Sequence, residues 1–186
     1  MQLDAQTFLQ LVKESGRLCT FDIEATGLAG DYNSVLVVSI KQFDNPKITT
    51  FHVDRPGKDR EVVRDAISEL SRYACWISYY GKGFDVPMLQ ARALKHRLPP
   101  LEKQCHIDMF FQLVSKVKTS RKSQAHFLRW LGTPEQKMDM SPEEWNQVLS
   151  NPKTAIKKMI SRCESDVVGL EGLFRRTEHL IGNITR

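Results

Sequence analysis

Hydrophobic and polar positions repeat with two different periods along the chain, and the first third shows the strand period. Segments rich in Val, Ile, Phe and Thr predict strands over residues 17–24, 34–43 and 47–53. Turn residues separate these segments at Gly27–Gly30 and at Asp44-Asn45-Pro46. The pattern therefore predicts an antiparallel meander of three strands.

Helical spacing of apolar residues dominates the rest of the chain. A short helix over residues 4–14 precedes the meander, and a helix over 59–73 leads into a buried apolar strand over 75–80, which indicates a crossover connection. Further helices are predicted over residues 84–98, 107–117, 123–131 and 152–180, with another beginning at the capping-box sequence Ser141–Glu144. The predicted class is α/β, a mixed sheet with helices flanking it and a helical second half.

Several aromatic residues from Trp76 onward fall on apolar stripes. We predict that Trp76, Phe110, Phe111, Phe127 and Trp130 belong to the core rather than to a surface that stacks on bases.

Length and composition add limits to this picture. A chain of 186 residues without a linker, repeat or low-complexity tract is predicted to form a single domain over residues 1–186. No apolar run approaches the roughly 18 residues of a membrane span, so we predict no membrane partner and a cytoplasmic location. The four cysteines lie far apart and are predicted to be reduced thiols.

Charge favours a polyanionic partner. The formal net charge is +5 and the pI is near 9.1, and basic residues cluster around Lys95, Lys118 and Lys157. Each cluster alone is typical of a solvated surface.

Acidic residues occupy positions that core packing does not explain. Strand alternation places Thr20, Asp22 and Glu24 on one face, just before a glycine turn. Two carboxylates on one face repel each other, although exposed edge strands also carry such pairs. Asp85 follows a buried strand and the glycine loop Gly81–Gly83, where it either caps a helix or serves a site at the end of the strand.

Asp166 discriminates best between a structural and a functional interpretation. It lies three residues after Cys163 and four before Leu170, on the apolar side of the last predicted helix. A buried, ionised aspartate is costly unless it pairs with a cation or binds a metal. With Asp22, Glu24 and Asp85 it would form an oxygen-rich site suited to two Mg²⁺ or Mn²⁺ ions, and such a pair of ions supports phosphodiester hydrolysis.

Three segments resemble, in order and spacing, the motifs of the DEDD 3′→5′ exonuclease superfamily. They are residues 21–28 (FDIEATGL), residues 81–89 (GKGFDVPML) and residues 163–167 (CESDV). The likeness extends from about Leu18 to Phe174 and is strongest to stand-alone relatives of the proofreading domain of family-B DNA polymerases.

The resemblance implies a ribonuclease-H-like fold and a nuclease that shortens single-stranded DNA or RNA from a 3′ end. It also implies that Asp22, Glu24, Asp85 and Asp166 are the catalytic, metal-binding residues. Residues expected to contact the substrate are Thr26, Gly27, Leu28, Tyr80, Lys82, Phe84 and Arg162.

The chain departs from the superfamily pattern at two positions. Ser161 and Arg162 stand where a Tyr or His usually orients the attacking water, and Tyr80 stands where an asparagine is usual. Tyr80, His106 or His126 could replace the base, or metal-bound hydroxide could form without one.

Two other functions remain as alternatives. One is a non-catalytic or weakly active nucleic-acid-binding module of the same fold, and the other is a structure-specific endonuclease. The sequence does not decide between DNA and RNA, and it identifies no protein partner.

Overall fold

A mixed five-stranded sheet forms the centre of the protein in the computed structural model, which describes residues 4–135 and 138–182. The strands are β1 (Leu18–Ala25), β2 (Val35–Gln42), β3 (Ile48–His52), β4 (Cys75–Ser78) and β5 (Cys105–Asp108). Their order across the sheet is β3-β2-β1-β4-β5. The first three strands pair antiparallel, whereas β4 and β5 continue the sheet in parallel with β1. The predicted meander and the α/β class are confirmed.

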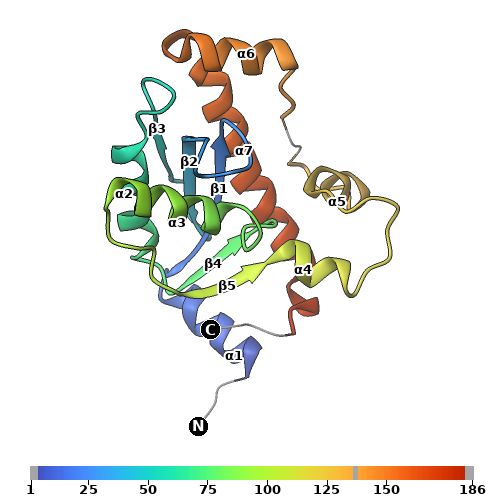
Figure 1. The fold of residues 1–186 in the computed structure, drawn as a ribbon. Helices are drawn as coiled ribbons and strands as arrows, with labels where there is room; N and C mark the ends of the chain where they lie inside the picture. Colours follow the sequence, from blue (N-terminus) through green and yellow to red (C-terminus); the bar gives the residue numbers. More distant parts are fainter. Residues whose placement is uncertain (1–3, 136–137, 183–186) are drawn as a thin grey trace.

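Helices surround this sheet (Figure 1). They are α1 (Ala5–Glu14), α2 (Arg60–Leu70), α3 (Asp85–His96), α4 (Met109–Val114), α5 (Gln124–Trp130), α6 (Pro142–Ser150) and α7 (Pro152–Thr177), followed by the 3₁₀ turn Glu178–Leu180. The capping box predicted at Ser141 is confirmed, since its hydroxyl accepts from the Glu144 N–H and the Glu144 carboxylate accepts from the Ser141 N–H. None of the helices in the described part of the chain is long and apolar enough to cross a membrane.

The predicted helix over 107–117 is wrong at its start. Residues Cys105–Asp108 form β5 at the edge of the sheet, and the helix covers only Met109–Val114. A strand of four residues is too short to show its own period, and Ile107 also fits the helical spacing of the residues that follow. Pairing with β4 decided the outcome.

The prediction that five aromatic residues lie in the core was correct only in part. Trp76 and Phe127 are buried, but Phe111 is 46% and Trp130 57% exposed, and Phe110 is half-buried. The helices that carry Phe111 and Trp130 have six and seven residues, so the apolar stripe is too short to define which side meets the core.

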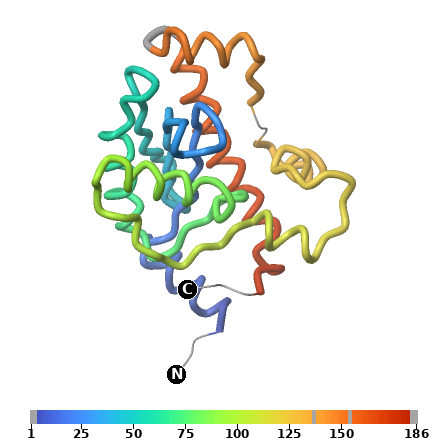
Figure 2. Tube along the Cα trace, in the orientation of Figure 1, coloured from blue at the N-terminus to red at the C-terminus, as the bar shows by residue number. Residues whose placement is uncertain are grey.

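Helix α7 covers one face of the sheet, where it contacts β1 and β2, while α2 and α3 lie on the other side (Figures 1 and 2). The Thr20 hydroxyl donates to the Val167 carbonyl at 3.0 Å, and Lys41 forms a buried ion pair with Glu171. Because side chains alternate along a strand, Asp22 and Glu24 share the α7 face with Thr20. The fold thus aims two acidic residues of β1 at the longest helix.

Candidate metal centre

Three carboxylates converge between β1 and α7. Asp22, Glu24 and Asp166 each place a carboxylate oxygen within 4.8 Å of the others. Glu24 and Asp166 are buried, and Asp22 is half-buried. All donors are hard oxygen atoms, which suits Mg²⁺ or Mn²⁺ and disfavours a soft or tetrahedral metal. These donors fit the divalent ions that the sequence motifs imply.

Neighbouring groups hold this part of α7 against β1. The Cys163 thiol lies 3.4 Å from the Asp22 carbonyl and 3.5 Å from Asp22 Oδ2. Burial, followed by the Asp22 and Glu24 carboxylates, raises the pKa of this thiol well above its usual value, which keeps it protonated as a donor. The Gln124 side chain of α5 donates to the Asp166 carbonyl at 2.8 Å. The sequence pattern predicts neither contact, because each joins segments that are far apart in the chain.

Asp85 is the first residue of α3, so it is not the residue that caps the helix. Its Oδ1 accepts from the Ile23 N–H at 3.1 Å. Strands β1 and β4 are paired only from Leu18 to Thr20 of β1, so the Asp85 carboxylate satisfies a backbone donor at the point where the two strands separate.

Charge accumulates around this carboxyl group. Burial, assisted by the Asp108 and Glu24 carboxylates, raises the pKa of Asp85 to about 7. Asp85 lies outside the group of three, but it is close enough to share its electrostatic field.

The glycine loop before α3 is fixed by Asp108, at the end of β5. Its carboxylate accepts from the backbone N–H groups of Tyr80 at 2.8 Å and Lys82 at 2.9 Å, and it caps α4 through Phe110 N–H. A side chain at Gly81 would be only 2.3 Å from the Ser78 hydroxyl, so the turn requires glycine there. The carboxylate that caps α4 therefore also holds the glycine loop.

A cleft of about 370 Å³ borders the acidic residues. It is lined by Asp22, Ile23, Leu28, Tyr79, Tyr80, Gly83, Phe84 and Asp85. Three of the residues predicted to contact substrate are therefore in one cavity with two of the predicted metal ligands. Leu28 is 87% exposed at its rim.

The other predicted contact residues lie elsewhere. Thr26 is engaged within its own turn, where its hydroxyl contacts Asn33 and accepts from Ser34 N–H. Gly27 packs against the same Asn33 side chain, which a Cβ would approach to 2.6 Å. Lys82 lines a different pocket. Thr26 and Gly27 therefore affect the cleft only through the shape of their own turn, and Lys82 does not line the cleft.

Arg162 forms an ion pair within the acidic group. Its Nε donates to Glu24 Oε1 at 2.6 Å, and its guanidinium lies 5.9 Å from the centre of the Trp145 ring. Burial alone would lower the pKa of Arg162, but Glu24, Asp166 and Asp22 raise it overall. The residue that replaces the usual Tyr or His is thus a cation that neutralises part of the carboxylate charge.

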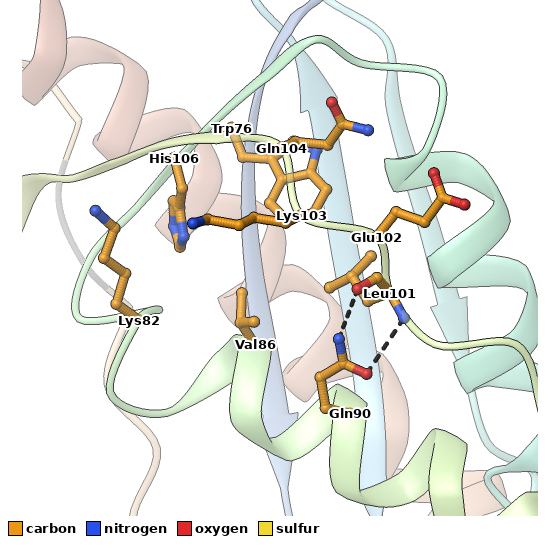
Figure 3. A pocket seen from close by; sticks show the side chains of 9 residues that line it. All are labelled: Trp76, Lys82, Val86, Gln90, Leu101, Glu102, Lys103, Gln104 and His106. Carbon is orange, nitrogen blue, oxygen red and sulfur yellow. Dashed lines mark hydrogen bonds between the residues drawn. The ribbon is translucent and has the colours of Figure 1, made fainter. Parts of the chain in front are cut away.

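His106 faces a second pocket, of about 400 Å³, rather than the acidic residues (Figure 3). Figure 3 shows it with Lys82 and Lys103, and no residue that lines this pocket lines the cleft of Asp22. Its Nε2 lies 2.7 Å from the Ser78 hydroxyl, and burial followed by Lys82 lowers the pKa of His106 to about 3.

His126 is on α5, where its ring packs against Phe127. His106 is buried and neutral and faces the second pocket, so it does not reach the acidic site. Of the three candidate bases, Tyr80 is the one that lines the cleft.

Comparisons with known proteins identify the superfamily and support the fold. A family model, RNase_H_2 of the RNase H superfamily, matches residues 19–177. No curated protein sequence matches the chain.

Among solved structures, a family B DNA polymerase from the hyperthermophilic archaeon Pyrobaculum calidifontis is similar, with a TM-score of 0.63 and 18% identity. The match covers 87% of this chain and 24% of the polymerase, so the chain spans about a quarter of that protein. The resemblance stated from the motifs is confirmed by the superfamily match and by this shared fold.

Proposed function

Because the chain belongs to the ribonuclease H superfamily, we propose that it is a nuclease that uses two divalent ions to remove nucleotides from the 3′ end of a single strand. The observation that supports this most directly is the convergence of Asp22, Glu24 and Asp166 within 4.8 Å, next to a cleft that also contains Asp85. Residues 1–186 would form one nuclease domain.

The four carboxylates would hold the ions. Bound Mg²⁺ or Mn²⁺ supplies Lewis-acid stabilisation of the phosphodiester and lowers the pKa of a bound water. Asp22 and Glu24 present their oxygens from a rigid strand, and Asp166 does so from the helix packed on it. Asp85 would complete the set after losing its proton, which the nearby positive charge of a metal favours.

The remaining groups would position the strand. Leu28 and Phe84 line the cleft and offer apolar contact to terminal bases. Arg162 offers a guanidinium beside the carboxylates, where a substrate phosphate would lie next to the metals. Tyr80 is the candidate to orient the attacking water, and the alternative is that metal-bound hydroxide forms without a side-chain base.

A second function is favoured by one specific contact. In the Arg162–Glu24 ion pair, a carboxylate that is predicted to bind a metal ion is bound by a cation of the protein instead. If that pair persists in solution with divalent ions present, the domain would bind nucleic acid and cleave it slowly or not at all.

The test uses a 5′-labelled single-stranded DNA and its RNA counterpart, incubated with the protein in EDTA, Mg²⁺ or Mn²⁺. We expect a ladder of shortened products that requires metal and disappears in Asp22→Ala and Asp166→Ala. The relative rates on the two strands identify the preferred nucleic acid.

A circular single strand separates the remaining alternatives. Cutting of the circle would indicate an endonuclease. A bound strand that yields no product in any metal would contradict the nuclease and support the binding module.

A further inference from the structure

Three aromatic rings gather beside the cleft. The Tyr80 ring centre lies 5.0 Å from that of Phe110 and 5.8 Å from that of Phe111, and the two phenylalanine rings are 5.2 Å apart. We call Tyr80, Phe110 and Phe111 the aromatic platform. It joins the glycine loop to α4, two segments about 30 residues apart in the sequence.

The platform presents its rings to solvent. Tyr80 is 45% and Phe111 46% exposed, although both are large aromatic side chains. Core packing would bury them, so their exposure together indicates a surface that meets another molecule.

The backbone keeps the Tyr80 ring in place at a conformational cost. Tyr80 has a φ of 65°, a left-handed conformation that is unfavourable for a bulky residue. Asp108 holds this turn through the Tyr80 and Lys82 N–H groups. The ring lies directly over Gly83, where a Cβ would come within 2.5 Å of Tyr80 Cζ. Tertiary contacts thus maintain a strained tyrosine whose ring remains on the surface.

Basic residues adjoin the platform. The Tyr79 hydroxyl donates to the Lys122 carbonyl, and the Tyr79 ring lies 6.0 Å from that of Phe110. These contacts bring the segment that carries Lys118, Arg121 and Lys122 next to the aromatic rings, and all three side chains are exposed. Aromatic faces beside cationic side chains are complementary to a single strand, whose bases stack and whose phosphates carry negative charge.

The platform is also continuous with the acidic cleft. Tyr80 lines the same cavity as Asp22 and Asp85, so a strand whose end reaches the carboxylates passes the platform. Paired bases in a duplex cannot offer their faces to the rings without leaving the stack.

We propose that the aromatic platform stacks on unpaired bases of a single-stranded nucleic acid while Lys118, Arg121 and Lys122 contact its phosphates. This inference rests on the proposed function for the class of substrate, and it assigns the residues that select an unpaired strand.

The experiment measures binding of fluorescein-labelled single strands by anisotropy in EDTA, where no cleavage occurs. Each strand, DNA and RNA, is compared with an abasic DNA strand of equal length, which keeps the phosphates and lacks the bases. Phe111→Ala should weaken binding of the base-bearing strands roughly 5- to 150-fold, the effect expected from the loss of one stacked base. It should leave binding of the abasic strand unchanged.

Two variants serve as matched controls. Phe111→Tyr keeps an aromatic face and should bind like the wild type. Leu94→Ala removes another apolar side chain, which is 75% exposed and lies near the end of α3 that is far from Asp85. It should change the binding of neither strand. A triple substitution of Lys118, Arg121 and Lys122 to Gln removes three positive charges. For both strands it should reduce the slope of log affinity against log salt concentration by about two.

Other outcomes would overturn the inference. Equal weakening of base-bearing and abasic strands by Phe111→Ala, or no weakening, excludes stacking. A change from dimer to monomer in Phe111→Ala with unchanged strand binding would show that the platform is a self-association surface.

The result is independent of cleavage. Base-dependent binding without metal-dependent products would retain the platform and reject the nuclease. Products in Mg²⁺ or Mn²⁺ without base-dependent binding would do the reverse.

Discussion

Asp59 and Asp166 are both almost fully buried, with 0% and 2% exposure, yet their surroundings are opposite. Asp59 precedes α2 and accepts two hydrogen bonds from Arg92, at 2.8 Å each, one contact from His96 at 2.8 Å and one from Val35 N–H at 2.9 Å. Asp166 lies instead among other carboxylates, those of Asp22 and Glu24. One buried acid is surrounded by cations and donors, whereas the other lies within a group of like charges that Arg162 neutralises in part.

The pKa of Asp59 and that of Asp85, which lies beside the acidic group, also shift in opposite directions. Burial raises the pKa of Asp59, but Arg92, His96 and Val35 lower it below its usual value overall. At the acidic end of the sheet, burial raises the pKa of Asp85 to about 7, and Asp108 and Glu24 add to the rise. A buried carboxylate whose charge the protein compensates is structural, whereas a group of carboxylates that repel one another indicates a site for an external cation.

The largest expected effect is on catalysis at the acidic site. Asp166→Asn removes one ligand charge, and we expect product formation to fall roughly 10³-fold or more, since metal stabilisation of the transition state is worth several kcal/mol. Without metal, the same variant should be at least as stable as the wild type, because one repulsive charge is gone. Steady-state cleavage and urea unfolding measure the two effects. A large loss of stability would mean that the Asp166 carboxylate stabilises the fold, as the Asp59 carboxylate does.

A loss of stability is instead expected at Asp59. Asp59→Ala leaves Arg92, whose side chain is 3% exposed, without its counter-ion, and it should lower the free energy of unfolding by about 3–5 kcal/mol. The exposed pair Arg64–Asp65 gives a matched control, since Asp65→Ala should cost about 1 kcal/mol or less. Mn²⁺ affinity of the molecules that remain folded should not change. If Asp59→Ala abolishes metal binding in a fully folded protein, the distinction between the two sites fails.

Arg162 makes the acidic site resemble the surroundings of Asp59 in one respect, because it places a compensating cation beside Glu24. Arg162→Gln removes its ion pair with Glu24, and we expect Mn²⁺ to bind roughly ten-fold or more tightly, since a hydrogen bond to a charged group is worth about 1.5–3 kcal/mol. Isothermal titration calorimetry measures this without relying on activity. Weaker Mn²⁺ binding would mean that Arg162 supports the metal site rather than competing with it.

Near neutral pH the smallest effect concerns His106, a buried group outside the acidic site, because its contribution to stability changes only below about pH 6.5. Its pKa is lowered to about 3 when folded, against about 6.5 when unfolded. The unfolded chain therefore binds the extra proton first, so this contribution to stability is complete above pH 6.5 and is lost as pH falls toward 3.

The loss should reach at most about 1.4 kcal/mol per pH unit. Urea unfolding of the wild type and of His106→Gln across this range measures it. An unchanged slope in His106→Gln would assign the acid sensitivity to other groups.

Local patterns were sufficient to predict much of the site. Strand alternation placed Asp22 and Glu24 on one face, and the position of Asp166 on an apolar helical stripe predicted its burial, which the structure confirms. Both inferences depend only on the periods of strands and helices, which neighbouring residues determine.

Tertiary structure decided the remaining features. Arg162 and Glu24 are 138 residues apart, and Asp85 and Ile23 are 62 apart, so no local period connects them. Strand β5 exists because its four residues pair with β4, and the aromatic platform exists because the glycine loop and α4 meet at Asp108.

By itself, the sequence determined the class of fold, the order of the acidic motifs and the face on which each acid lies, because these follow from short-range periodicity. Only the tertiary structure decided which cation neutralises Glu24, which backbone group Asp85 binds and which aromatic rings remain exposed. Those features depend on contacts between segments that packing, rather than sequence proximity, brings together.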